Sequence, residues 1–280
     1  MLLPESIQSI IREALAEDIG QGDITTNSTI PEDVRCEARV VTRQPGVLSG
    51  SQVFRTVFEL LNSRMSDWNA VPDGQRFSAG QEVVRFQGLT RSVLTGERVA
   101  LNFLQRLSGI ATLTAEFVGA VNGLGVKICD TRKTTPLMRR LQKLAVTHGG
   151  GANHRFALFD GVLIKENHIV GAGGIRDAVR KACQGTHHLL KIGVEVTTVE
   201  EAKEAADAGA DAIVFDNMRP EDIRSIVAQL KDRRIIFEAS GNVTFDTVRA
   251  LAETGVHVIS IGALTHSAPA IDMSLLIRNV

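Results

Sequence analysis

The 280-residue sequence contains no tyrosine, one tryptophan and only 4% aromatic residues in all. Proteins that bind single-stranded nucleic acid stack the bases on aromatic side chains, so this composition disfavours such a role. The charge is balanced, with 31 lysines and arginines against 32 aspartates and glutamates, so no overall field attracts nucleic acid or a membrane surface. Any site for an anion must therefore be built locally.

Cysteine is also scarce. Cys36, Cys129 and Cys183 are scattered, odd in number and without a C-x-x-C pair, which disfavours a disulfide framework and a zinc site. No apolar run is long enough to span a bilayer, and the amino-terminal stretch has no basic region of the kind that begins a signal peptide. We therefore expect a cytoplasmic protein with neither a membrane nor a nucleic acid as its partner.

The first part of the chain predicts a mixed α/β unit. Apolar residues at helical spacing predict a helix over 5–17, and the segment SQVFRTVFELL at 51–61 predicts another. The runs CEARVVTR at 36–43 and EVVRFQG at 82–88 predict strands of an antiparallel sheet. A long apolar-periodic segment at 97–121 predicts a helix that joins this unit to the next.

From about residue 124 short apolar runs alternate with amphipathic helical segments. This alternation favours a parallel sheet. Six such units predict a TIM-like α/β barrel that is short of eight strands, and a doubly wound open sheet is the alternative. The predicted strands are VKIC (126–129), VLI (162–164), VEV (194–196), AIVF (212–215), IIFEA (235–239) and VISIG (258–262).

Polar residues stand at or just past the end of each predicted strand. In a parallel barrel the carboxyl ends of all strands meet at one rim, where active sites of this fold are built. A cluster of four cations at this rim suits carboxylate or phosphate groups and consists of Arg132, Lys133, Arg155 and Lys165. On the opposite side we expect Glu195 and Asp216, which suit Mg²⁺ or ribose hydroxyls.

The loops after the last two predicted strands are expected to bind phosphate. We expect Ser240-Gly241 and Gly262-Ala263 to open helices, whose N-termini attract anions. Each rim residue also has a structural reading: Arg132 and Lys133 as solvated charges, Lys165 as a strand-end cap, Glu195 as an outward strand residue and Asp216 as a helix cap. Because six strands deliver polar chemistry to one rim, we favour a site for a phosphorylated polyanion with a divalent metal.

The chain resembles the quinolinate phosphoribosyltransferase family, also called nicotinate-nucleotide pyrophosphorylase (carboxylating), over nearly its whole length. The resemblance rests on the motifs EDIGQGDITT, GERVALNFLQRLSGIAT, DTRKTTP, GGGANHRFALFDGVLIKENHI, FDNM, EASGNV and GALTHSAPAIDMSL. It implies an N-terminal α/β sandwich, set at 1–110 with a possible return of the C-terminal segment, and an incomplete barrel at 111–280 that carries the active site. It also implies a homodimer, in which Arg98 reaches the partner's site.

The resemblance assigns roles to the rim residues. The two carboxylates of quinolinate would be held by Arg132, Arg155 and Lys165, helped by Thr131, Lys133 and His154. The ribose and Mg²⁺ would face Glu195 and Asp216, and the 5-phosphate of phosphoribosyl pyrophosphate would meet Ser240, Gly241, Gly262 and Ala263, with Asn242 and His266 nearby. The residues with catalytic roles would be Lys133, Lys165, Glu195 and Asp216. Asn242 departs from the family pattern, in which a second glycine is common, and places an amide beside the phosphate loop.

The implied reaction joins quinolinate to the phosphoribosyl group with loss of CO₂ and gives nicotinate mononucleotide and pyrophosphate, a step of NAD biosynthesis. Three other functions remain: a phosphoribosyltransferase for a monocarboxylate such as nicotinate, the paralogue of this fold associated with molybdate uptake, and a non-catalytic sugar-phosphate sensor. Four cations favour a dicarboxylate over a monocarboxylate. A sensor would be expected to lose acids such as Glu195 and Asp216.

Overall fold

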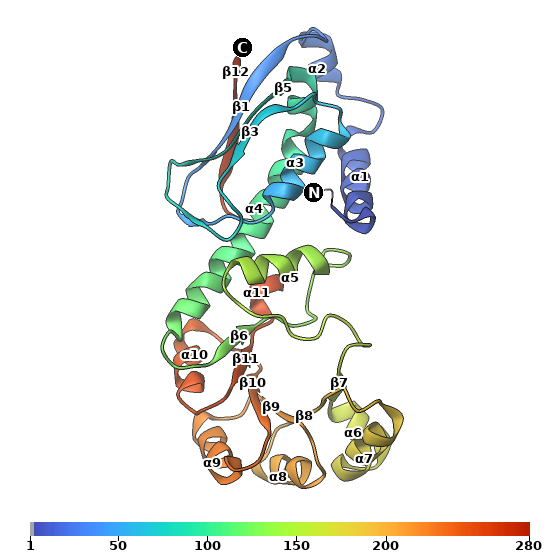
Figure 1. Cartoon of the computed structure of the whole chain (residues 1–280), viewed down its shortest axis with the longest axis vertical. Helices are drawn as coiled ribbons and strands as arrows, with labels where there is room; N and C mark the ends of the chain where they lie inside the picture. The colour runs from blue at the N-terminus through green and yellow to red at the C-terminus, as the bar shows by residue number, and fades with distance from the viewer. Residues whose placement is uncertain (1–2) are drawn as a thin grey trace. The chain divides into compact units, whose positions relative to one another are not determined.

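The computed structural model describes residues 3–280 and divides them into two compact units (Figure 1). The first unit extends to Ala115 and also includes Thr135–Gly150 and Ser267–Val280. The second unit comprises Glu116–Thr134 and Gly151–His266. The predicted domain limits of 1–110 and 111–280 stay a prediction.

The first unit contains an antiparallel four-stranded sheet with the strand order β12-β1-β5-β3. The predicted strands at 36–43 and 82–88 are confirmed as β1 and β5, and the C-terminal strand β12 pairs with β1 along its whole length. Its elements are α1 (Glu5–Ile19), α2 (Ile24–Thr29), β1 (Arg35–Thr42), β2 (Gly46–Val47), α3 (Ser51–Leu60), β3 (Ser66–Ala70), β4 (Arg76–Phe77), β5 (Glu82–Leu89), α5 (Arg139–His148) and β12 (Met273–Asn279), with most of α4 (Thr90–Ala120).

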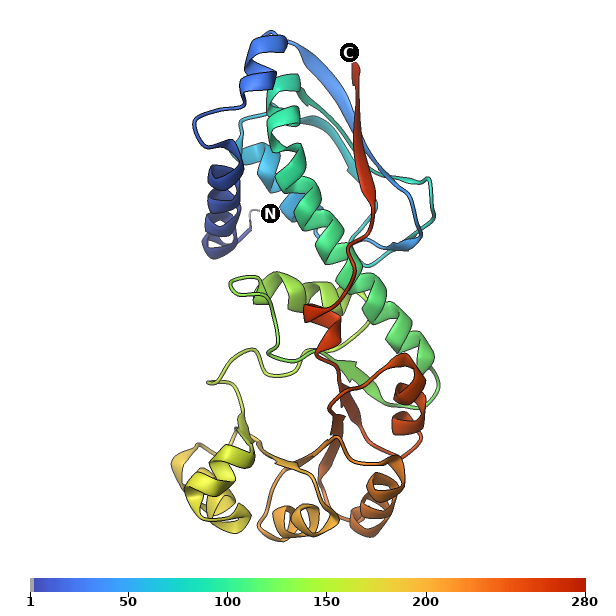
Figure 2. The same cartoon turned by 180° about the vertical axis from the view of Figure 1, so that it is seen from behind.

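The core of the first unit lies between this sheet and the helices α1, α3 and α4, which cover one face of the sheet in both views (Figures 1 and 2). Phe54 and Phe58 of α3 pack on Phe86 of β5, with ring centroids 6.2 and 4.9 Å from it. Helix α1 buries Ile7, Ile11 and Leu15, which recur every four residues as the sequence predicts. Burial of this apolar stripe is what makes the helix stable in context.

The second unit is built on a six-stranded parallel sheet with the order β6-β11-β10-β9-β8-β7. All six predicted strands are confirmed. Its elements are β6 (Lys127–Cys129), β7 (Val162–Ile164), α6 (Glu166–Ala172), α7 (Ile175–Gly185), β8 (Ile192–Val196), α8 (Val199–Asp207), β9 (Ala212–Asp216), α9 (Pro220–Leu230), β10 (Ile236–Ser240), α10 (Phe245–Ala252), β11 (Val258–Ser260) and α11 (Ala263–His266).

This sheet is an incomplete barrel, and the doubly wound alternative is wrong. Its strands run in chain order from β7 to β11, and the first strand, β6, then pairs with β11. A doubly wound sheet would reverse its strand order at a switch point and carry helices on both faces. The curved sheet instead has α7, α8, α9 and α10 along its outer side (Figure 1). The barrel is not closed between β6 and β7, which stand at the two ends of the strand order.

The helices of the second unit begin where the sequence supplies capping groups. Thr198 and Glu201 form a capping box at the start of α8, and Pro220 occupies the first turn of α9. Because each strand is followed by a helix that returns the chain, the strands are parallel and their carboxyl ends lie side by side. Within residues 3–280, no helix has both the length and the apolar character needed to cross a membrane.

Candidate active site

One cavity of about 730 Å³ lies in the second unit, at the carboxyl ends of the parallel strands. The structure brings together in it every rim residue that the sequence and the resemblance single out. These are Thr131, Arg132, Lys133, His154, Arg155, Lys165, Glu195, Asp216, Ser240, Gly241, Asn242, Gly262, Ala263 and His266. Residues at or just past the ends of six strands make up most of this set, as the barrel geometry requires, and His154 and Arg155 come from the segment between α5 and β7.

Arg98 is the one predicted site residue that belongs to the first unit. It lies on α4, where its side chain is exposed. Its reach into the site of a partner subunit stays a prediction.

The loop after β6 holds Lys133 by its backbone. The Thr131 hydroxyl accepts a hydrogen bond from the Lys133 N–H at 3.0 Å, and the Thr265 hydroxyl donates to the Lys133 carbonyl oxygen at 2.7 Å. A Cβ at Gly262 would lie 3.0 Å from Cδ of Lys133 and 3.1 Å from Nε2 of His266. Glycine at 262 therefore lets both basic side chains pass close to the chain at the edge of the cavity.

Arg155 is prepared to bind an anion. Its Nη1 donates to the Gly161 carbonyl oxygen at 2.7 Å, whereas its Nε is buried and has no hydrogen-bond partner among residues 3–280. Burial and the nearby charge of Arg132 lower the pKa of the Arg155 guanidinium from its usual value. Two guanidinium groups that converge in a partly buried place call for a negatively charged ligand.

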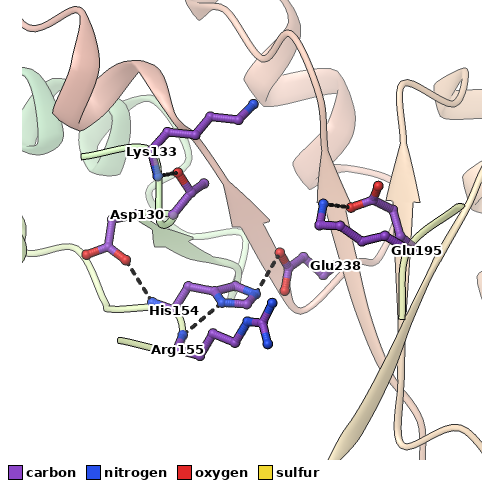
Figure 3. Close-up of polar contacts among 8 residues, drawn as sticks. Asp130, Lys133, His154, Arg155, Glu195 and Glu238 are labelled. Atoms are coloured by element: carbon purple, nitrogen blue, oxygen red, sulfur yellow. Dashed lines mark hydrogen bonds and ion pairs between the residues drawn. The ribbon is translucent and has the colours of Figure 1, made fainter. Parts of the chain in front are cut away.

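His154 is fixed by hydrogen bonds on its backbone and on its ring (Figure 3). Its backbone N–H donates to Oδ1 of Asp130 at 2.9 Å, and Asp130 is fully buried at the end of β6. Its ring Nδ1 accepts the Arg155 N–H at 2.8 Å, and its Nε2 lies 3.6 Å from Oε1 of Glu238. The imidazole is therefore held between the loop that carries Arg155 and strand β10.

Lys165 and Glu195 form an ion pair with Nζ and Oε2 2.5 Å apart (Figure 3). The expectation that the carboxylates lie opposite the four cations is wrong for this pair. Lys165 follows β7 and Glu195 lies in the adjacent strand β8, so the two side chains meet across neighbouring strands. The Glu195 side chain is 19% exposed and so sits in the wall of the cavity, which also disagrees with an outward-facing strand residue.

The turn after β10 is shaped by a close approach of two strand ends. Ser240 pairs with Asp216 in the sheet, so the residues that follow them, Gly241 and Asn217, come together. Gly241 has a φ of +90°, and a Cβ there would lie 2.5 Å from Cγ of Asn217. The amide of Asn242 donates to Oδ1 of Asn217 at 2.9 Å. Glycine at 241 adopts the left-handed conformation without strain and has no Cβ that would collide with Asn217.

The expectation that Ser240-Gly241 opens a helix is wrong. Helix α10 begins at Phe245 after the N-cap Thr244, because the left-handed residues Gly241 and Asn242 keep the chain out of the helical conformation. Helix α11 does begin at Ala263, immediately after Gly262. Asp216 is also no helix cap, since the N-cap of α9 is Arg219. Two differently shaped turns thus border this side of the cavity.

Glu238 and Asn217 are polar residues that line the cavity and received no role from the sequence. Glu238 is 8% exposed in the structure. Its place within the apolar run IIFEA was the signal in the sequence, because a carboxylate is costly to bury unless its charge has a function. Asn217 follows β9 with a φ of +53° and holds the turn at Gly241. Nothing in its sequence neighbourhood indicates that contact, because it arises from strand register.

The carboxylates fit a magnesium ion that arrives with a phosphorylated substrate. Within the described chain, 3–280, no group of three or more histidine, cysteine, aspartate or glutamate residues is arranged to hold a metal. Glu195 and Asp216 both face the cavity. Mg²⁺ commonly binds one or two carboxylates together with substrate phosphates and water, so this donor set suits it without a protein cage.

Comparison with known proteins decides the family. A family model described as quinolinate phosphoribosyl transferase, C-terminal domain, matches residues 110–276, and its N-terminal counterpart matches residues 23–108. The chain belongs to the quinolinate phosphoribosyltransferase family. The resemblance seen in the motifs is thereby confirmed, and so is the combination of an N-terminal α/β unit with an incomplete barrel.

Individual members of the quinolinate phosphoribosyltransferase family match over almost the full chain. The Bacillus subtilis (strain 168) protein named probable nicotinate-nucleotide pyrophosphorylase (carboxylating) is 43% identical over 269 residues, which cover 96% of this chain and 92% of that protein. The structure of the Francisella tularensis nicotinate-nucleotide pyrophosphorylase is 40% identical with a TM-score of 0.93, covering 99% and 98% of the two chains. The crystal structure of NadC from Streptococcus pyogenes is 38% identical with a TM-score of 0.95, covering 100% and 99%.

Proposed function

We propose that this protein transfers the phosphoribosyl group of phosphoribosyl pyrophosphate to quinolinate and releases CO₂, with nicotinate mononucleotide and pyrophosphate as the other products. The observation that supports it most is the cavity of about 730 Å³, which gathers the basic residues and the turns after β10 and β11 within one unit. Membership of the quinolinate phosphoribosyltransferase family supports the same activity.

The reaction consists of a substitution followed by a decarboxylation. The pyridine nitrogen of quinolinate attacks C1 of the ribose, and the bond from C1 to the pyrophosphate oxygen breaks with its electron pair on pyrophosphate. The ring nitrogen is now positively charged. The bond between C2 and its carboxylate then breaks, CO₂ leaves, and the electron pair left on C2 is stabilised by the adjacent nitrogen until a proton replaces it. No side chain needs to act as a nucleophile.

The main task of the protein is to hold two mutually repelling anions in reacting positions, which supplies several kcal/mol of rate enhancement. In this proposal Arg132 and Arg155 bind the carboxylates of quinolinate as forked donors. Lys165 joins them when a substrate carboxylate replaces Glu195 as its partner. Arg155 has a buried Nε that no residue within 3–280 satisfies, which supports its place in this subsite.

Phosphoribosyl pyrophosphate is proposed to lie along Glu195 and Asp216 and against the turns after β10 and β11. Backbone N–H groups after β10 and β11 bind its 5-phosphate, at Gly241 and at Gly262-Ala263. Glu195 and Asp216 face the ribose, where they stabilise positive charge that develops on C1 as pyrophosphate departs. Glu195 and Asp216 would hold Mg²⁺ together with the pyrophosphate, where it would supply positive charge for the leaving group. Lys133 contributes a further positive charge for that group.

We also propose a homodimer in which Arg98 completes the site of the partner subunit. Arg98 is exposed on α4, which suits a contact with another chain. We retain the expected cytoplasmic location as part of the proposal, because the three cysteines of the sequence are scattered and odd in number.

An activity measurement tests the reaction. The purified protein is incubated with quinolinate, phosphoribosyl pyrophosphate and Mg²⁺ while CO₂ and nicotinate mononucleotide are followed together. Equal amounts of both, abolished when Mg²⁺ is chelated, are expected. Turnover of nicotinate in place of quinolinate would retain phosphoribosyl transfer but contradict the dicarboxylate assignment, and no turnover with either acid would overturn the proposal.

Subunit complementation tests the role of Arg98. Arg98→Ala and Arg132→Ala are each expected to be inactive alone. After the two proteins are unfolded and refolded together in equal amounts, half of the dimers carry one intact site, so about a quarter of the wild-type activity is expected to return. A mixture that stays as inactive as its components would show that Arg98 serves the site of its own chain.

A further inference from the structure

Glu238 is an unexpected residue in a cavity that suits anions. Its carboxylate is 8% exposed and shares the cavity with Glu195 and Asp216. A buried carboxylate weakens the binding of a negatively charged substrate through like-charge repulsion, unless its charge is used within the protein. The contact that uses it is the imidazole of His154, with Nε2 3.6 Å from Oε1 of Glu238.

The structure assigns one tautomer to His154. Its Nδ1 accepts a hydrogen bond from the backbone N–H of Arg155 at 2.8 Å, and a nitrogen that accepts in this way carries no hydrogen. The ring hydrogen of the neutral imidazole therefore sits on Nε2, the atom that faces Glu238. Figure 3 shows the ring between the Arg155 backbone and the Glu238 carboxylate.

Glu238 is itself held firmly. It lies in the middle of β10, paired with Val214 of β9 on one side and Val258 of β11 on the other. His154 by contrast belongs to a loop after the isolated bridge from Cys129 to Ala152. The Glu238 carboxylate is thus held in place by the sheet, and the loop contacts it through the imidazole of His154.

We propose that Glu238 is a positioning residue of the dicarboxylate subsite and acts through His154. This inference rests on the proposed function. The Glu238 carboxylate, 3.6 Å from Nε2 of His154, attracts the Nε2–H and so restrains the ring, and Nδ1 then holds the backbone N–H of Arg155. The guanidinium of Arg155, anchored on Gly161, is thereby presented to a substrate carboxylate. Glu238 is assigned no contact with phosphoribosyl pyrophosphate or Mg²⁺.

Steady-state kinetics separate this role from a direct one. Glu238→Ala is expected to raise KM for quinolinate about tenfold while KM for phosphoribosyl pyrophosphate and the Mg²⁺ requirement change less than about twofold. Glu238→Gln keeps a carbonyl oxygen beside Nε2 that still attracts the Nε2–H, so its KM for quinolinate is expected within about threefold of the wild type. An equal rise in KM for phosphoribosyl pyrophosphate, or a greater need for Mg²⁺, would assign Glu238 to the other substrate and overturn the proposal.

A double-mutant cycle asks whether Glu238 acts through His154. In a His154→Ala background, Glu238→Ala is expected to have no further effect on KM for quinolinate, because the side chain it orients is gone. Effects that multiply instead would contradict the proposal. The matched control is Glu253→Gln, which removes a carboxylate that pairs with Arg249 on the outer helix α10 and is expected to leave both KM values unchanged.

Nuclear magnetic resonance of the ligand-free protein gives a readout that does not depend on activity. With ¹⁵N-labelled histidine at pH 8, where the ordinary imidazole is neutral, His154 of the wild type is expected to show hydrogen on Nε2 alone. In folded Glu238→Ala, Nδ1 still accepts the Arg155 N–H and the tautomer is expected to persist, but the Nε2–H resonance of His154 is expected to shift because the neighbouring carboxylate is gone. An unchanged Nε2–H resonance in that variant would refute the link. Absence of turnover with quinolinate by the wild type would instead refute the proposed function, and the Nε2–H resonance would still report on the link to Glu238.

Discussion

Replacement of Gly241 by alanine tests the origin of the turn that borders the proposed phosphate site. Gly241 has a φ of +90°, and its new Cβ would lie 2.5 Å from both Cγ and Oδ1 of Asn217. The Asn217 side chain would have to rotate away. In doing so it would lose the hydrogen bond from its Nδ2 to Asp216 at 3.1 Å and the bond that its Oδ1 accepts from Asn242 at 2.9 Å.

Two costs determine the expected loss of stability. The left-handed conformation costs alanine roughly 1–2 kcal/mol. The two hydrogen bonds lie on an exposed side chain, so each contributes toward the lower end of the usual range, about 0.5 kcal/mol. We therefore expect Gly241→Ala to lower the free energy of unfolding by about 2–3 kcal/mol. The displaced turn is also expected to raise KM for phosphoribosyl pyrophosphate more than KM for quinolinate.

Chemical denaturation monitored by circular dichroism measures the loss, and two controls identify its cause. Gly119→Ala introduces the same methyl group on helix α4 with no atom within 4 Å, and it is expected to stabilise the protein by up to about 1 kcal/mol. In an Asn217→Ala background the contact is relieved, so Gly241→Ala should cost only the conformational part. A wild-type stability for Gly241→Ala, or the same cost with and without the Asn217 side chain, would refute the reasoning.

Three further predictions concern charged residues. Arg155→Ala is expected to weaken quinolinate binding about 30-fold or more and to weaken phosphoribosyl pyrophosphate binding far less. Calorimetry measures both affinities. An equal loss of affinity for the two substrates would show that Arg155 is assigned to the wrong subsite. Glu195→Gln should tighten quinolinate binding severalfold, because the Glu195 carboxylate no longer competes with the substrate for Lys165. The same change should lower kcat about 100-fold, because the carboxylate that stabilises charge on the ribose is lost. Weaker quinolinate binding in this variant would show that Glu195 does not compete for Lys165. Arg278 lowers the pKa of Glu37 through a hydrogen bond, so the stability that this pair adds is present above about pH 4.3 and disappears as the pH falls through the lowered pKa. Arg278→Met should therefore destabilise the protein more at pH 7 than at pH 3 in parallel denaturation curves, and equal losses at both would count against the pair.

The sequence predicted the barrel strands well because each is a short apolar run bounded by polar residues. Strand β3, SDWNA, was missed since it lies at the edge of its sheet and has few apolar residues. Helix α2, ITTNST, was missed because β-branched residues disfavour helices. It forms because Asp23 caps it, accepting the N–H of Thr26 at 2.9 Å.

The sequence predicts which residues line the cavity, but not which of these residues contact one another. Residues past the strand ends converge by topology alone, which is why the rim residues share one cavity. The pair of Lys165 with Glu195 depends on side-chain conformation across neighbouring strands, and the turn at Gly241 depends on sheet register. These contacts join residues 30 and 24 positions apart, for which the sequence carries no local signal.

The pairing of β12 with β1 has a consequence for synthesis on the ribosome. Val40 of β1 pairs with Leu275 of β12, so one edge of the first sheet lacks its strand until residues 273–279 have emerged. At about 5–20 residues per second, translation leaves that edge exposed for on the order of ten seconds or longer. An exposed edge of this kind pairs readily with other chains. The nascent protein should thus depend on chaperones most strongly during this interval, while the barrel between the two strands is being made.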